Sequence, residues 1–334
     1  MRTSAAILVL AFAAAFTVCG QQGLSTPALY TGTCDASAAA ALDNDRFVIG
    51  NDEDNVLRVY SRSRPGPPVW TIDLSDFLGV KKSVEADIEG ATRVGDRIYW
   101  ISSHGRNEDG ELRPGRQRFF ATQIVTNDAG VVLAPVDRPC ATLLEAMVNE
   151  PALRRFNLAQ AAQRGSKQRG TLSIEGLSAS PEGGLLIGFR SPVPDGKALL
   201  LPLLNPEELL QGGPARFGAP ILLDLGGLGI RSIEWEGDGY WIIAGHHDDD
   251  VPSRLYFWKG GSSPARWARQ VSLSFLNPES TLSFVEGNKR QYHIISDDGG
   301  VSIGGRKCKD LKDPSLKRFR SYIILDPDAA KGLP

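Results

Sequence analysis

The sequence is poor in the residues and motifs on which several large classes of catalytic site depend. Its 334 residues include only four histidines, four cysteines and two methionines. It contains no HExxH pair for zinc, no phosphate-binding P-loop and no GxGxxG motif. These absences leave zinc peptidases, P-loop NTPases and dinucleotide-binding enzymes without support.

Excess charge and long apolar runs are also missing. The chain carries 37 Lys and Arg against 39 Asp and Glu, a net charge of −2. A general nucleic-acid binder needs a basic face, which this balance argues against. No stretch after residue 20 approaches the roughly 18 uninterrupted apolar residues of a membrane helix.

The N-terminus has the pattern of a secretory signal. Arg2 precedes an apolar run over residues 5–18, and Val18 and Gly20 suit cleavage before Gln21. We therefore expect a signal peptide over 1–20 and a periplasmic or secreted protein. A lipid anchor on Cys19 is the less favoured alternative, because Val18 is bulky for the residue before a lipidated cysteine.

One pattern occurs five times along the rest of the chain. Each copy has an acid, a strand, a Gly, Asp or Asn turn, and a second, apolar strand with a small third residue and a polar fifth one. The acids are Asp35, Glu89, Glu175, Glu234 and Glu279; the small residues are Gly50, Ser102, Gly188, Ala244 and Ser296; the polar ends are Asp52, His104, Arg190, His246 and Asp298. Repeats of roughly 40–50 residues, with several strands each, are typical of a β-propeller.

The strand count favours an all-β propeller with five four-stranded blades in one domain, residues 24–326. The fifth repeat is one strand short, and β-forming residues at 26–32 can complete it. A six-bladed ring, with the extra blade cut from 190–225, is the alternative. Residues 140–169 have apolar positions at helical spacing and predict a small α-helical insertion.

Three cysteines remain after the predicted signal, Cys34, Cys140 and Cys308. In an oxidising compartment they allow one disulfide in three pairings. A closed ring brings the first and last repeats together, which favours Cys34–Cys308. Three buried thiols are the equally open alternative.

The repeated acids and polar ends are expected on one face. In a blade the first two strands are antiparallel, so the head of one lies beside the end of the other. Five carboxylates at one mouth raise one another's pKa values unless a counter-charge is present. The candidates for that charge are a cation such as Ca2+, which binds six to eight oxygens, or the arginines Arg190, Arg231 and Arg106. A third alternative is that the acids bind backbone N–H groups of neighbouring blades and only hold the ring together.

Histidines are weaker candidates. His246 and His247 are adjacent, so along a strand they would point to opposite faces and only one could reach the site. Zinc bound by His104 and His246 is a secondary alternative. The segments NDEDN (51–55) and HHDDD (246–250) have the composition of calcium loops, but neither has the Gly and Glu of an EF-hand, so we expect solvated turns.

The repeats also resemble a known family. GTCDASAAAALDNDRFVIGNDEDNVLRVY, EADIEGATRVGDRIYWISSHGRNEDGE, SIEGLSASPEGGLLIGFRSP and HIISDDGG with the later CKDL are similar to bacterial proteins catalogued as domain of unknown function 3616. The resemblance implies a β-propeller-like fold and no established activity. The IEG openings are more loosely similar to phytase-like and lactonase-like propellers, which implies a calcium-assisted hydrolase.

The resulting hypothesis is an exported hydrolase of an ester, lactone or phosphoester. A calcium ion held by Asp35, Glu89, Glu175, Glu234 and Glu279 would polarise the scissile group. Glu89, Glu175 or His104 would activate water. A small-molecule ligand at the mouth would contact Arg190, His246, Arg231, Arg106, Asp52 and Asp298. A propeller that binds a ligand or protein without catalysis is the alternative.

Overall fold

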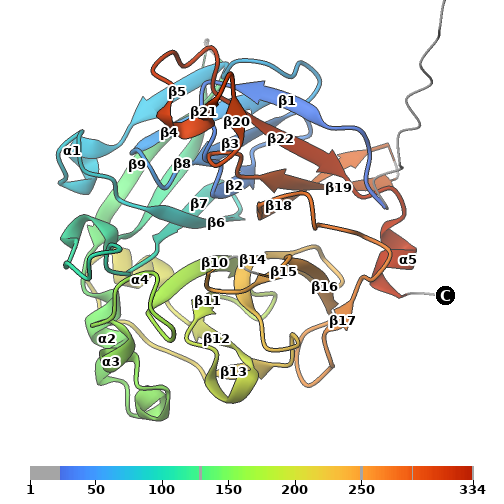
Figure 1. Cartoon of the computed structure of the whole chain (residues 1–334). Helices are drawn as coiled ribbons and strands as arrows, with labels where there is room; N and C mark the ends of the chain where they lie inside the picture. The colour runs from blue at the N-terminus through green and yellow to red at the C-terminus, as the bar shows by residue number, and fades with distance from the viewer. Residues whose placement is uncertain (1–22, 128–129, 249–250, 288, 333–334) are drawn as a thin grey trace, which may run out of the picture.

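Five four-stranded antiparallel sheets stand around a central axis (Figure 1). The computed structural model describes residues 23–127, 130–248, 251–287 and 289–332, so the predicted signal peptide lies outside it. The first blade contains β2 (Ala38–Ala41), β3 (Arg46–Gly50), β4 (Val56–Ser61) and β5 (Trp70–Asp73). The second contains β6 (Ile88–Val94), β7 (Arg97–Ser102), β8 (Phe119–Asn127) and β9 (Gly130–Cys140).

The next two blades follow the same order of strands. The third contains β10 (Ser173–Ala179), β11 (Leu185–Ser191), β12 (Ala198–Leu203) and β13 (Ile221–Leu223). The fourth contains β14 (Gly229–Trp235), β15 (Tyr240–Gly245), β16 (Arg254–Trp258) and β17 (Arg266–Trp267). The six-bladed alternative is wrong, because the strands at 190–225 complete the third blade.

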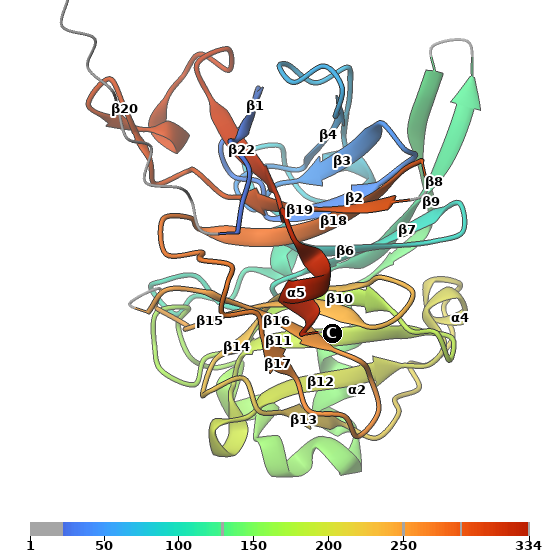
Figure 2. The same ribbon diagram turned by 90° about the vertical axis from the view of Figure 1, so that its right-hand side faces the viewer.

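The fifth blade joins the two ends of the described chain. It consists of β18 (Pro278–Glu286), β19 (Lys289–Ser296), β22 (Arg318–Ile323) and β1 (Ala28–Thr31). Strand β1 pairs antiparallel with β22, with Tyr30 opposite Phe319, and Figure 2 shows the two strands side by side. A disulfide joins Cys34 to Cys308, and Cys140 is a buried free thiol. The five-bladed ring closed by the first strand and the favoured cysteine pairing are both confirmed.

Crowding between blades explains the small third residue of each second strand. A Cβ atom added to Gly188 would lie 2.7 Å from Ile230 Cγ2, on the inner strand of the next blade. At Gly50 it would lie 3.0 Å from Ile88 Cγ2. Ser102, Ala244 and Ser296 are fully buried. The small residues therefore lie where the sheets converge, and they let neighbouring blades approach.

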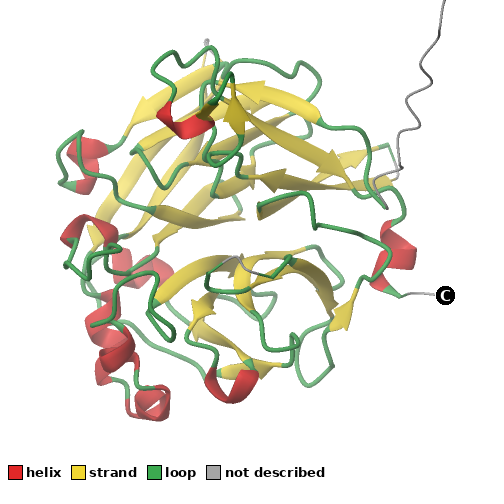
Figure 3. Cartoon of the chain, in the orientation of Figure 1, coloured by secondary structure: helices red, strands yellow, loops and turns green. Residues whose placement is uncertain are grey.

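Helices are few and lie outside the sheets (Figure 3). The predicted insertion contains α2 (Leu143–Asn149), the 3-10 helix Pro151–Phe156 and α3 (Leu158–Ala161). Their buried apolar side chains pack against apolar residues of the second and third blades. The remaining short helices and the small hairpin are α1 (Ser75–Leu78), α4 (Pro206–Leu210), α5 (Pro327–Lys331), the 3-10 turns Pro114–Arg116, Pro194–Gly196 and Cys308–Asp310, and β20 (Ser302–Ile303) with β21 (Arg306–Lys307). Across the described residues, no helix has the length and apolar character needed to cross a membrane.

Candidate functional site at the mouth of the central channel

Four of the five inner strands carry a bulge at the same level. The pairing with the second strand skips one residue in β6, β10, β14 and β18; the skipped residues are Glu89, Glu175, Arg231 and Glu279. A bulge turns the side chain of its extra residue away from the regular alternation. The alanine strand β2 of the first blade pairs without a skip. The bulges thus bring three glutamates and one arginine to one level of the axis.

Blade four departs from the sequence alignment at this point. Its acid was expected to be Glu234, but the bulge position is occupied by Arg231. Glu234 lies three residues further along β14, where it lines the channel more deeply. Burial and then the charge of Glu236 raise the pKa of Glu234 well above its usual value. Placing Glu234 at the mouth was therefore wrong, because a one-residue bulge is invisible in a sequence alignment.

The channel itself is narrow. The cavity on the axis is lined by Glu89, Glu175, Glu234 and Glu279 together with small and apolar residues. Its free volume is about 10 Å³, room for about one water molecule. A larger ligand is therefore confined to the mouth.

On one side of the mouth, arginines neutralise the glutamates. Arg231, which is 3% exposed, donates to Glu279, and its Nε lies 3.6 Å from Glu175 Oε2. Arg190 Nη1 lies 2.8 Å from Glu175 Oε1. Arg231 also donates to Asn277 Oδ1 at 2.6 Å. We call Glu175, Glu279, Arg190 and Arg231 the balanced side. The predicted pairing of acids with Arg190 and Arg231 is found here.

On the other side, five carboxylates gather without an equal number of cations. Single carboxylate oxygens of Asp35, Asp52 and Asp297 lie within 4.8 Å of one another, and so do those of Asp52, Asp87 and Glu89. Asp52 belongs to both groups, so the five residues form one continuous cluster. We call it the acidic side. Its residues come from the first blade, from the start of the second blade and from the fifth blade.

Three members of the acidic side have no partner among the described residues. Neither a hydrogen-bond donor nor a basic side chain contacts the carboxylates of Asp35, Asp52 and Glu89 there, although Asp35 is only 3% exposed and Asp52 Oδ1 is buried. Asp87 accepts from Ser103 and lies 3.3 Å from Arg116 Nη1. Hence the alternative in which the aligned acids bind backbone N–H groups fails for Asp35 and Glu89.

Burial makes the carboxylates of the acidic side hard to ionise. It raises the pKa of Asp35 to about 6, with a further contribution from Glu53. It raises the pKa of Asp87 to about 6 even though Arg116 and Ser103 act to lower it. The pKa values of Asp52, Glu89 and Asp297 lie well above their usual ranges, first because of burial and then because of neighbouring carboxylates. Such a site favours either protons or a bound cation.

Asp87 and Asp297 were missed by the sequence analysis, as was the cation beside Asp87, Arg116. The repeat alignment assigned one acid to each copy, whereas Asp87 and Asp297 are second acids next to an aligned one. Asp297 Oδ1 accepts from the backbone N–H of Gly299 at 2.6 Å. The paired letters in EADIEG and SDDGG were the available signal.

The other predicted site residues lie apart from the acidic side. Asp298 is buried against Arg320, with N–O distances of 2.6 and 2.7 Å. Arg106 does not pair with the acids; it donates to Ala162 O, Gly110 O and Gln163 Oε1, tying its loop to the helical insertion. Both residues therefore have structural partners.

His104 is buried at the end of the second blade's second strand. Its Nδ1 bonds the carbonyl of Ser102 at 2.8 Å, and its Nε2 has no partner among the described residues. Burial lowers the pKa of His104 to about 4, and the charged side chain that acts on it is Arg118 rather than a carboxylate. Its ring is therefore neutral at pH 7. No group of possible metal ligands in the described part of the chain contains His104 together with His246.

Ser302 has the spacing of a serine nucleophile but not the setting. The stretch GVSIG at 300–304 fits the GxSxG pattern. That pattern activates serine on a sharp turn from a strand into a helix. Ser302 instead lies exposed in the two-residue strand β20, paired with β21. This stretch is therefore not evidence for a serine hydrolase.

The sequence matches a known protein family. Residues 122–296 match the model of a family described as protein of unknown function (DUF3616), which is more than half of the chain. The chain belongs to this family. The resemblance found in the sequence is thereby confirmed, and the family's description supplies no activity.

More distant likenesses concern the overall arrangement. No curated protein matches the sequence. The GH43_1 enzyme of Xanthomonas citri is 13% identical, with a TM-score of 0.45 and 90% of each chain covered. The glutaminyl cyclase of Myxococcus xanthus is 12% identical, with a TM-score of 0.44, 90% of this chain and 95% of the other covered. Neither comparison bears on the residues of the mouth.

Proposed function

We propose that the acidic side binds one calcium ion and that the protein is an exported, calcium-assisted hydrolase of an ester, lactone or phosphoester. The main observation in favour of a cation is the buried carboxylate of Asp35. It has no partner among the described residues and lies next to the carboxylates of Asp52 and Asp297. Burying an ionised carboxylate without a partner is strongly unfavourable. A hard cation with oxygen ligands relieves that cost.

The residues divide between holding the cation and acting on water. Asp35, Asp52 and Asp297 would hold the calcium ion, leaving coordination positions toward the mouth. A bound calcium ion would polarise a carbonyl or phosphoryl oxygen placed there. Glu89, which has no hydrogen-bond partner among the described residues, is the carboxylate free to take a proton from water, with Asp87 beside it. Glu175 is held by two arginines and is better suited to fixing them.

The size of the channel limits the substrate. Because the axis accommodates about one water molecule, the scissile group has to approach from the mouth. Export is part of the proposal, and the Cys34–Cys308 disulfide supports it because disulfides persist in oxidising compartments.

Calcium binding and hydrolysis are tested separately. Titration of chelator-treated full-length protein with CaCl2, followed by calorimetry and thermal melting, should show one site and a higher Tm, because calcium binds the folded state. Asp52→Asn should abolish both effects. Asp96→Asn is the matched control, because Asp96 lies exposed in the turn between β6 and β7, at the opposite end of the strand from Glu89. Identical melting curves in calcium and in chelator would rule out the proposed calcium site.

Hydrolysis is then measured on the calcium-loaded protein with a panel of aryl esters, lactones and phosphoesters. Glu89→Gln should lower the turnover of an accepted substrate at least 100-fold while calcium still binds. Calcium binding without turnover of any member would instead support the non-catalytic binding propeller. That alternative has one observation in its favour, since Arg190 and Arg231 already neutralise half of the mouth.

A further inference from the structure

We propose a second metal site, for a borderline transition metal such as zinc, formed by His246, His247 and Asp248 beside a cavity that accepts an anionic group. It differs from the calcium site in donor type and place. Nitrogen donors of imidazole suit zinc, whereas the acidic side offers only oxygen. The inference therefore does not depend on the proposed hydrolase.

Both histidines reach one place because the strand ends before them. Strand β15 stops at Gly245, so the alternation of a strand no longer applies to the next residues. The two imidazole rings lie 4.4 Å apart between centroids, tilted by 59°. The expectation that the two histidines point to opposite faces was wrong for this reason.

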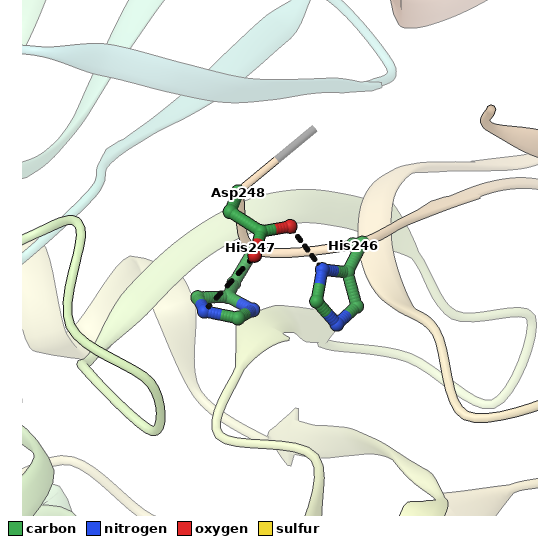
Figure 4. Close-up of side chains that lie close together, drawn as sticks. All are labelled: His246, His247 and Asp248. Atoms are coloured by element: carbon green, nitrogen blue, oxygen red, sulfur yellow. Dashed lines mark hydrogen bonds and ion pairs between the residues drawn. The ribbon is translucent and has the colours of Figure 1, made fainter. Parts of the chain in front are cut away.

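The three side chains present converging donors (Figure 4). The Asp248 carboxylate lies between the two rings, with one oxygen bonded to His246 Nδ1 and the other 3.8 Å from His247 Nε2. One ligand atom from each residue lies within 4.8 Å of the others. Zinc binds such atoms at about 2.0–2.2 Å, so its ligands stand roughly 3.3 Å apart. Small side-chain rotations therefore suffice to close the triad around an ion.

The backbone at this place is fixed from the neighbouring blade. Arg190 donates to the carbonyl of His246 through Nε at 2.9 Å and Nη2 at 2.8 Å. Its Nη1 binds Glu175 at the axis. The start of the turn is thus anchored, which favours a preformed metal site over one that must be ordered by the ion.

A cavity of about 590 Å³ lies beside the triad, and His246 and His247 are among its lining residues. Arg155 and Arg169 line it too, and neither makes an ion pair within the described chain; Arg155 stacks on the ring of Phe156 at 4.7 Å. The only lining carboxylate among these residues is that of Asp195. Two guanidinium groups without an ion pair among the described residues suit an anionic ligand such as a phosphate or carboxylate.

Three protein ligands leave the fourth position of a tetrahedral zinc ion open, as in catalytic zinc sites. Because the histidines line the cavity, that position is available to a ligand held by Arg155 and Arg169. The chemical class is therefore a small molecule with a phosphate or carboxylate group, bound jointly by metal and arginines.

The first test is metal binding by chelator-treated full-length protein. Calorimetry with ZnCl2 should give one site, and His247→Ala and His246→Ala should each weaken it at least 30-fold. Asp195→Asn changes a residue of the same cavity outside the triad and should leave zinc affinity unchanged. Asp52→Asn should lose calcium binding and keep zinc binding, so that failure of one site is distinguishable from failure of the other. Circular dichroism and Tm establish that each variant is folded.

Cobalt provides a readout that a purely structural role would not give. Co2+ bound in wild type should show the visible absorption of a four- or five-coordinate ion, and inorganic phosphate should shift it. The double change Arg155→Met with Arg169→Met should keep the cobalt spectrum and weaken the phosphate effect at least 10-fold. Absence of zinc binding, or zinc binding that survives both histidine changes, would overturn the metal site. A phosphate response unchanged in the arginine variant would overturn the anionic ligand.

Discussion

The balanced and acidic sides of the mouth both contain clustered carboxylates, but the two sides surround these groups differently. On the balanced side, Glu175 and Glu279 share the buried guanidinium of Arg231. On the acidic side, Asp35, Asp52 and Glu89 have no cation in contact among the described residues. One side therefore has its charges compensated by the chain, and the other depends on protons or on an ion from solution. The comparison indicates that the balanced side supports the ring, whereas the acidic side is available for binding.

The largest expected effect comes from breaking the balanced side. Arg231→Met leaves Glu279 buried next to Glu175 without its main partner, and removing one member of a buried ion pair costs about 3–5 kcal/mol. Urea unfolding should show this loss. Arg113→Met, which removes an exposed partner of the exposed Glu111, should change the unfolding free energy by less than about 0.5 kcal/mol. Equal small losses in both variants would mean that Arg231 does not support the ring.

A second prediction compares the seams between blades on the two sides. Gly188→Val should cost about 1–3 kcal/mol, because even its Cβ would lie 2.7 Å from Ile230. Gly50→Val, where the corresponding distance is 3.0 Å, should cost less. Ala244→Leu adds bulk at the same level of the next blade without changing backbone freedom and should also destabilise. Unchanged urea midpoints in all three would contradict the alignment of the second strands.

On the acidic side, a substitution that removes a carboxylate should stabilise the metal-free protein instead of destabilising it. In chelator, Asp52→Asn should raise the unfolding free energy by about 1–2 kcal/mol, because it removes a carboxylate buried among others. With saturating calcium the order should reverse, since the wild type then gains from the ion and the variant does not. Thermal melts under both conditions measure the reversal. A variant less stable than wild type in chelator would show that Asp52 already has a stabilising role without metal.

A pH dependence of stability is expected on the acidic side. The pKa of Asp35 is raised to about 6 in the folded protein, above its unfolded value of about 3.9. The folded state therefore holds the proton more tightly, so this group's stabilising contribution is present below pH 4 and is lost as the pH rises through 6. In chelator, the unfolding free energy of Asp35→Asn should differ little from that of wild type near pH 4 and exceed it by about 2–3 kcal/mol near pH 7, because a pKa shift of about two units corresponds to about that free energy.

Comparison with the variant isolates this group from His104 and His293, whose pKa values are lowered to about 4. The contribution of the two histidines to stability changes with pH in the opposite direction. A histidine that is buried in its neutral form stabilises the fold above its unfolded pKa of about 6.5, and this stabilisation is lost as the pH falls from there toward 4. A constant difference between wild type and Asp35→Asn from pH 4 to 7 would mean that Asp35 is not perturbed.

The fold was predictable because its information is repeated five times. Each blade carries the same alternation of strands and turns, so an error in one copy is corrected by the others. The closing strand β1 and the Cys34–Cys308 pair then followed from the requirement that a ring bring its ends together.

The site was predictable only in part, because it depends on deviations from the repeat. The bulge in β14 exchanges the expected Glu234 for Arg231, and a one-residue skip leaves no mark in the sequence. Asp87 and Asp297 lie outside the aligned positions, so the average pattern omits them. The end of β15 at Gly245 places both histidines together, and strand ends are poorly defined by sequence.

The closure of the ring also decides when the acidic side exists. Asp35 lies next to the disulfide residue Cys34, whose carbonyl accepts from the N–H of Asp298 at 3.0 Å. Asp297, the other end of the cluster, belongs to the last blade. A chain that ends before residue 297 lacks Asp297 and strand β22 of the fifth blade, so it cannot assemble Asp35, Asp52 and Asp297 into one group. Under the proposed function, an ion would bind at the mouth only in molecules that have completed every blade, where it would join the two ends of the fold.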